Sequence, residues 1–223
     1  MKPGTQQHQV YIGEVIRNAV VFNFRERPGD EMNTDTLLEA VAGLFRLLSE
    51  REIEYALVGG VALLQYVEGR NTEDIDLVLA PSSLERLPEI EIASKDANFA
   101  RGSFCGVRVD FLLTSNSLFD KVRKSFVTSQ NFVEQEIPCA TVEGLLLMKL
   151  YALPSLYREG SFARVGLYEN DIATLVHDYK PDLAPLVEEL GGHLNAADLD
   201  EVRTIISEIR ERIERFEEGS IRG

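Results

Sequence analysis

The fold is decided by two neighbouring stretches, Tyr55-Ala-Leu-Val-Gly-Gly-Val-Ala-Leu-Leu and Arg70-Asn-Thr-Glu-Asp-Ile-Asp-Leu-Val-Leu. The first predicts an apolar strand, a glycine pair and a helix, and the second predicts a polar turn and another apolar strand. Alternate residues of a strand face the same way, so Asp74 and Asp76 should project from one face, with Cα atoms ~6.6 Å apart. Gly59 and Gly60 let the backbone approach a ligand, and the helix start that follows offers N–H groups to an anion. The pattern predicts a nucleotide site, with a phosphate cradle beside a pair of metal-binding carboxylates.

A third aspartate, Asp110, lies in a later segment where apolar and polar residues alternate, and we expect its strand to lie beside the strand of Asp74 and Asp76. The ordered set Gly59-Gly60, Asp74-Ile75-Asp76 and Asp110 resembles the nucleotidyltransferase superfamily typified by polymerase beta and the kanamycin nucleotidyltransferases. The local pattern Arg70-x-Thr72-x-Asp74-Ile75-Asp76 resembles the AbiEii-type nucleotidyltransferases, many of which are the toxin half of bacterial toxin–antitoxin pairs.

The resemblance implies an α/β (α+β) nucleotidyltransferase fold, with a mixed sheet flanked by helices and a C-terminal helical domain. It implies a transferase that moves a nucleoside monophosphate from an NTP to an acceptor hydroxyl on tRNA or protein. Alternatives are a small-molecule acceptor of the aminoglycoside type, and a binding protein of the same fold without turnover. Asp74, Asp76 and Asp110 would then be catalytic and hold Mg²⁺, in a site for two metal ions. A cognate antitoxin protein is a further partner that the resemblance implies.

The turn before the two aspartates contains Arg70 and Thr72. The guanidinium of Arg70 could hold a phosphate or the acceptor. Thr72 is a nucleotide-binding candidate too, but a local hydrogen bond that caps the turn is the favoured interpretation.

Lys149 is the one charged residue within a long apolar segment, so its ammonium must reach water, pair with an acid or serve a ligand. Asp171 is the candidate partner, because it shares a helix face with Tyr168 and Ile172. One interpretation is a buried pair that stabilises the helices. The other, implied by the resemblance, places both residues at the site, with Lys149 on the triphosphate. The two are compatible, and we expect the second because the phosphate site otherwise lacks a cation.

Composition limits the class of protein. The chain has 223 residues, a net charge of −14 and no apolar run or leader typical of membrane or secreted proteins, so a cytoplasmic protein is expected. Two distant cysteines favour reduced thiols, and the three histidines are isolated. The acidity disfavours a nucleic-acid partner, but residues 101–124 carry five bases and two acids and could guide a phosphate backbone locally.

Three regions are expected along the chain: an N-terminal extension over 1–32, a nucleotidyltransferase domain over 33–140 and a helical domain over 141–223. Helical spacing predicts a helix on the sheet over 36–48, and a hairpin is predicted over 99–113. After Thr141 the pattern predicts helices over 142–153, 168–179, 183–190 and 196–218. Pro138 is expected to interrupt the chain at the boundary between the two domains.

Overall fold

The computed structural model describes residues 34–67, 74–132 and 135–221, so the N-terminal extension over 1–32 lies outside the described residues. Its sheet-forming part contains these elements: α2 (Thr34–Glu50), β1 (Tyr55–Val58), α3 (Gly59–Leu63), β2 (Ile75–Leu79), α4 (Pro81–Leu84), β3 (Glu91–Lys95), β4 (Phe99–Phe104), β5 (Val107–Leu113), α5 (Ser117–Ser125), β6 (Val127–Phe132) and β7 (Gln135–Ala140). Four helices follow: α6 (Val142–Arg158), α7 (Phe162–Tyr179), α8 (Ala184–Gly191) and α9 (Ala196–Ile221).

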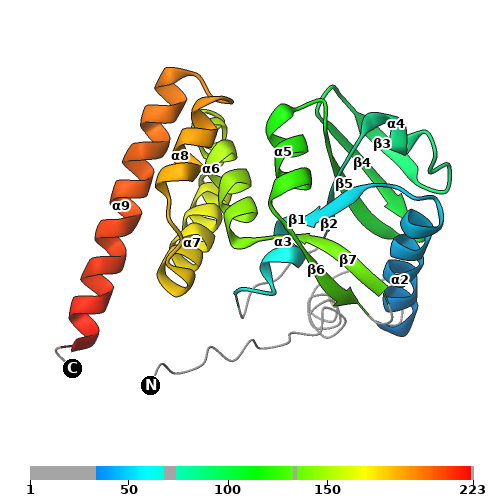
Figure 1. Cartoon of the computed structure of the whole chain (residues 1–223), viewed down its shortest axis with the longest axis horizontal. Coiled ribbons are helices and arrows are strands. Elements are labelled where there is room, and N and C mark those ends of the chain that lie inside the picture. Colours follow the sequence, from blue (N-terminus) through cyan, green and yellow to red (C-terminus); the bar gives the residue numbers. More distant parts are fainter. Residues whose placement is uncertain (1–33, 68–73, 133–134, 222–223) are drawn as a thin grey trace.

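The strands form one mixed sheet in the order β3-β4-β5-β2-β1-β7-β6. Its centre contains both kinds of pairing, because β2 is antiparallel to β1 and parallel to β5. The sheet lies between helix α2 and the group of helices that continues into the C-terminal half (Figure 1). The protein is therefore an α/β structure with a mixed sheet flanked by helices, as the sequence predicts.

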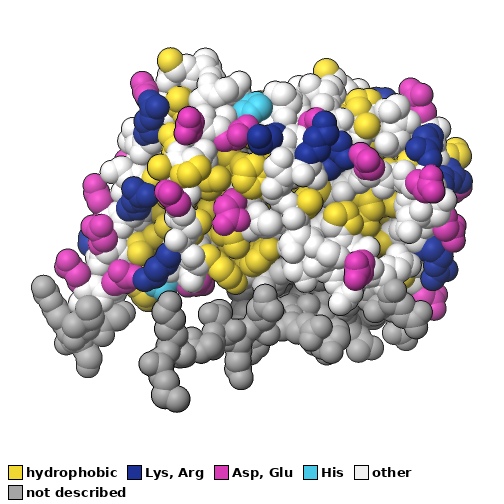
Figure 2. Space-filling model, viewed as in Figure 1, with side chains coloured by type: hydrophobic (Ala, Val, Ile, Leu, Met, Phe, Trp, Pro, Cys, Tyr) yellow, Lys and Arg dark blue, Asp and Glu magenta, His cyan; other side chains and the backbone are white. Residues whose placement is uncertain are grey.

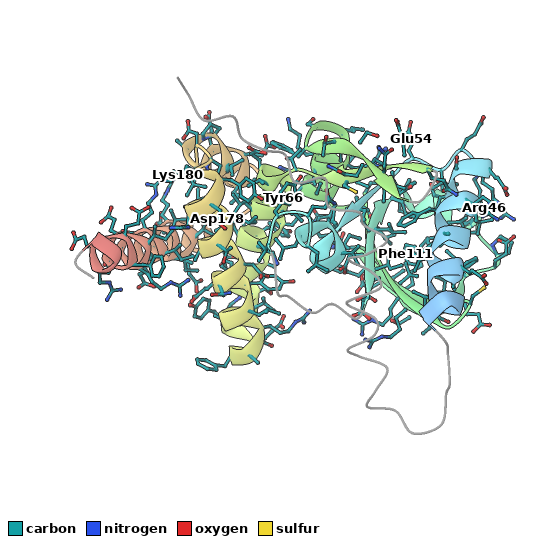
Figure 3. The ribbon with its side chains drawn as sticks, turned by 90° about the horizontal axis from the view of Figure 1, so that it is seen from below. Arg46, Glu54, Tyr66, Phe111, Asp178 and Lys180 are labelled. Carbon is teal, nitrogen blue, oxygen red and sulfur yellow. The ribbon has the colours of Figure 1, made fainter. Side chains whose placement is uncertain are left out.

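Helix α2 covers one face of the sheet through an apolar stripe. Leu44, Phe45 and Leu48 are at most 1% exposed, and the ring of Phe45 stacks on Tyr55 of β1 with centroids 6.0 Å apart. Figure 3 shows Phe111 of β5 between the sheet and α2. Alternate residues of β5, which include Asp110, consequently face the opposite side, toward the C-terminal helices.

Helix α6 is the central helix of the C-terminal half and packs against α7, α8 and α9. Leu145, Leu146, Leu147 and Leu150 are almost completely buried, as expected for a helix surrounded by protein. The sequence predicts its end at Leu153, but α6 continues through Pro154 to Arg158. Leu153 and Leu156 are both buried, and this burial outweighs the one backbone hydrogen bond that proline removes.

The β6–β7 hairpin corrects the expected role of Pro138, which lies inside β7 opposite Ser129 instead of interrupting the chain. The sheet ends at Ala140. Helix α6 begins at Val142, where the Thr141 hydroxyl accepts a hydrogen bond from the Gly144 N–H at 3.3 Å.

Polar contacts join the segments beside the sheet to the C-terminal helices. The hydroxyl of Tyr179 on α7 donates to the carbonyl of Tyr66 at 3.0 Å. His193, isolated in the sequence, lies with one ring nitrogen 2.9 Å from Ser117 Oγ of α5 and the other 3.2 Å from Glu189 Oε1 of α8. Among the described helices, none has the length and apolarity that a membrane crossing requires.

Candidate active site

Three of the predicted acids meet on one face of the sheet. Asp76 lies in β2 and Asp110 in the neighbouring parallel strand β5, and the two residues are direct register partners. Asp74 precedes β2 by one residue, so it continues the same face two positions before Asp76. The expectation that the strand of Asp110 lies beside the strand of Asp76 is confirmed.

The glycine pair lies directly against Asp76. Gly59 has φ +65°, and a Cβ atom at this position would lie 1.9 Å from Asp76 Oδ2. The Gly60 N–H donates to the same oxygen at 3.4 Å. Glycine is therefore required at position 59 by its backbone conformation and by the space that the carboxylate occupies.

Burial, followed by the negative charges of Asp110 and Asp74, raises the pKa of Asp76 to about 7. The Gly60 N–H and the positive charge of Lys149 act in the opposite direction. Because the ionised form of Asp76 is less favourable than that of an ordinary aspartate, an added cation would stabilise it.

Asp76→Asn is expected to stabilise the metal-free protein in EDTA at alkaline pH. The raised pKa means that the folded wild type loses stability as the pH rises from about 4 to about 7, because the unfolded chain ionises Asp76 more readily. The variant does not lose stability in this way. Its free energy of unfolding should therefore exceed that of wild type by an amount that grows over that interval and reaches on the order of 2 kcal/mol at pH 8. Urea unfolding at pH 5 and pH 8 measures it, and an advantage that is larger at pH 5 would contradict the prediction.

Two arginines, which the sequence analysis did not place at the site, pair with the acids. Arg101 of β4 forms a two-pronged ion pair with Asp110, at 2.8 Å and 3.0 Å. The Nε of Arg108 lies 2.7 Å from Asp74 Oδ1. The sequence does indicate the position of Arg108, because this residue precedes Asp110 by two and therefore lies on the same face of the strand.

The other three bases of residues 101–124 are also paired with acids. Lys121 lies 3.6 Å from Glu189, Arg123 contacts Glu54 at 2.6 Å and Asp120 at 3.0 Å, and Lys124 contacts Asp120 at 2.6 Å. This segment was expected to present a basic surface to a phosphate backbone. Each of the five positive charges thus lies in an ion pair with a carboxylate, and the contact with a phosphate backbone stays a prediction.

Lys149 and Asp171 form a buried ion pair between α6 and α7. Their charged atoms are 2.8 Å apart and the side chains are 7% and 2% exposed. The Lys149 ammonium also lies 4.2 Å from the centre of the Tyr168 ring. The expected pairing is confirmed. The sequence predicts that Lys149 contacts the nucleotide because the phosphate site otherwise lacks a cation. That argument is wrong, since Arg101 and Arg108 lie at the site.

The donor chemistry of the three acids suits Mg²⁺, which prefers carboxylate oxygens. In the part of the chain that the structure describes, however, no three acidic, histidine or cysteine side chains are already placed to hold a metal ion. The carboxylates of Asp74 and Asp110 are turned toward their arginines. The residues thus fit the ion in type and strand register, provided that the arginines move. Arg70 and Thr72 lie outside the described residues.

No protein-family model and no curated protein matches the chain. Among solved structures, the chain is similar to an antigenic nucleotidyltransferase-like protein from Paracoccidioides brasiliensis, with a TM-score of 0.56 and 19% identity over 81% of this chain and 91% of the other. It also matches the antibiotic-resistance factor ANT(2'')-Ia, with a TM-score of 0.48 and 11% identity over 85% and 99% of the two chains. At these identities the first likeness establishes the fold alone. The chain therefore has the fold of a nucleotidyltransferase-like protein.

Proposed function

We propose that this protein is a metal-dependent nucleotidyltransferase that moves a nucleoside monophosphate from an NTP to an acceptor hydroxyl. The observation that carries the proposal is the arrangement of Asp74, Asp76 and Asp110 on adjacent strand positions, beside the glycine pair. Burial and the neighbouring acids raise the pKa of Asp76 to about 7, so a divalent cation bound there would favour its ionised form.

Each residue has a role in this proposal. Asp74, Asp76 and Asp110 hold Mg²⁺, which when bound neutralises the triphosphate and the charge that develops on pyrophosphate. The carboxylate oxygens of Asp110 accept the proton of the attacking hydroxyl. The backbone of Gly59 and Gly60 lets the triphosphate approach closely. Four further residues support the site. Lys149 contacts the triphosphate and Asp171 orients the nucleotide or the acceptor. Arg70 binds a phosphate, and Thr72 lies in the nucleotide-binding turn.

The finer proposal is an AbiEii-type, toxin-like enzyme that acts on tRNA or on a protein side chain and has a cognate antitoxin. Two features support it. The first is the sequence pattern from Arg70 to Asp76. The second is the ion pair of Lys149 with Asp171, whose ammonium lies close enough to Asp76 to lower the pKa of that carboxyl.

A second candidate acceptor is a cationic small molecule of the aminoglycoside type. The net charge of −14 and the neutralisation of all five bases in residues 101–124 favour a positively charged acceptor over RNA. On the face shown in Figure 2, Lys and Arg side chains are interspersed with Asp and Glu and form no continuous basic patch.

The test measures the transfer of label from NTPs that are labelled on the α-phosphate, in the presence of Mg²⁺. Three classes of acceptor are offered: total tRNA, proteins including the enzyme itself, and aminoglycosides. Wild type is expected to label one class, and EDTA or Asp76→Asn should reduce transfer to background because the metal site is lost. Glu211→Gln, at an exposed acid on α9, is the matched control and should retain transfer. The labelled class decides the acceptor. Transfer that persists in EDTA or in Asp76→Asn contradicts the proposal, as does the absence of both transfer and Mg²⁺–NTP binding.

A further inference from the structure

Five charged residues occupy adjacent positions on one face of three neighbouring strands. Asp76 of β2, Asp110 of β5 and Arg101 of β4 form one row, because each is the register partner of the next. Arg108 lies two residues before Asp110, and Asp74 two residues before Asp76, which gives a second row. Three carboxylates therefore share this small area with two guanidinium groups.

The ion pairs place both guanidinium groups on carboxylate oxygens that a metal ion would need. Arg101 contacts both oxygens of Asp110, and Arg108 contacts Oδ1 of Asp74. A cation cannot bind these oxygens in the same geometry while the arginines hold them, since like charges repel at short range. Metal binding and arginine binding at these acids are therefore in competition.

The arginines can leave at low cost. The side chain of Arg101 is 65% exposed and that of Arg108 is 45% exposed, and exposed ion pairs contribute little net stability. Both are anchored on β-strands of the central sheet, so a guanidinium that releases its carboxylate stays within the site. Arginine also binds phosphate oxygens through the same two-pronged geometry that it uses for carboxylates.

We propose that Arg101 and Arg108 form an arginine latch on the metal-binding carboxylates, which opens when Mg²⁺ and a triphosphate bind together. Without ligand, the two guanidinium groups neutralise Asp110 and Asp74 in place of metal. When metal and triphosphate bind together, the carboxylates would hold Mg²⁺ and the guanidinium groups would move to phosphate oxygens. Metal alone then binds weakly, because it displaces the arginines without offering them a new anion. The inference rests on the proposed function and adds to it two phosphate-binding residues and a reason for coupled binding.

The test compares two affinities by isothermal titration calorimetry on the full chain: Mg²⁺ alone, and a nonhydrolysable NTP in saturating Mg²⁺. In Arg101→Gln/Arg108→Gln, Mg²⁺ alone should bind about tenfold more tightly, because the competing charges are gone. The NTP should bind about tenfold or more weakly, because the phosphates lose charge-assisted hydrogen bonds. Opposite changes in the two affinities are the signature of the latch, and a merely structural role would not produce them.

Arg203→Gln, which removes an arginine from an exposed ion pair on α9, should leave both affinities unchanged. If the double variant fails to fold, Arg101→Gln alone is measured, and the same opposite changes are expected at smaller size. Unchanged or weaker Mg²⁺ binding in a folded variant overturns the latch, and so does unchanged or tighter NTP binding. In those cases the proposed function survives if wild type binds Mg²⁺–NTP. The absence of Mg²⁺ and NTP binding in wild type and variants alike overturns both.

Discussion

Gly59→Ala is expected to abolish nucleotide transfer and to lower the free energy of unfolding by about 2–4 kcal/mol. The positive φ of +65° is strained for any residue with a Cβ atom. The added Cβ would also lie 1.9 Å from Oδ2, 2.4 Å from Cγ and 2.7 Å from Cβ of Asp76, so the aspartate side chain cannot stay in place. The central acid of the site must move, and the metal site proposed here is lost with it. Urea unfolding and the label-transfer assay measure the two effects.

Gly160→Ala is the matched control for this change. Gly160 has nearly the same backbone conformation, φ +66°, but an added Cβ would meet no atom within 4 Å. It should therefore cost only the backbone strain, about 1 kcal/mol, and leave transfer unchanged. The difference between the two variants isolates the contact with Asp76. Equal stability in the two variants, or full transfer by Gly59→Ala, would show that the glycine does not shape the site.

The position of the three acids could be predicted because it depends on local regularities. Alternation along a strand fixes which face Asp74 and Asp76 share, and the same alternation fixes the face of Asp110. Apolar residues around each acid identify the strands as buried, and Leu77, Val78 and Leu79 are all fully buried. The pairing of β2 with β5 then brings the acids together without any long-range information beyond that one contact.

The arginine partners were harder to predict: alternation along β5 places Arg108 on the face of Asp110, but the position of Arg101 also depends on the register between strands. Arg101 faces Asp110 only because β4 and β5 pair with this particular offset. The β6 and β7 strands were missed for a different reason: Val127–Phe132 is largely polar, and Pro138 weakens the strand signal of Gln135–Ala140. Strand β3 is exposed throughout and has no apolar alternation that would reveal it.

Lys149→Met is expected to lower the free energy of unfolding by about 3–5 kcal/mol. It leaves the carboxylate of Asp171, whose side chain is 2% exposed, buried without its ammonium partner. Lys149→Met/Asp171→Leu removes both charges and should recover most of the loss, since apolar side chains of similar size fill the same space. Urea unfolding of the single and double variants measures the difference. Lys124→Met is the control at the exposed Lys124–Asp120 pair and should cost less than about 1 kcal/mol.

The double variant also separates the structural role of Lys149 from its proposed nucleotide role. Because the variant should be folded and stable, any loss of function cannot be assigned to unfolding. If Lys149 contacts the triphosphate, the NTP should bind about tenfold more weakly, through loss of a charge-assisted contact. The positive charge that lowers the pKa of Asp76 also disappears, so the pKa of that carboxyl should rise further. A single variant as stable as wild type would contradict the buried-pair prediction, whereas a stable double variant with wild-type NTP affinity would leave Lys149 a purely structural residue.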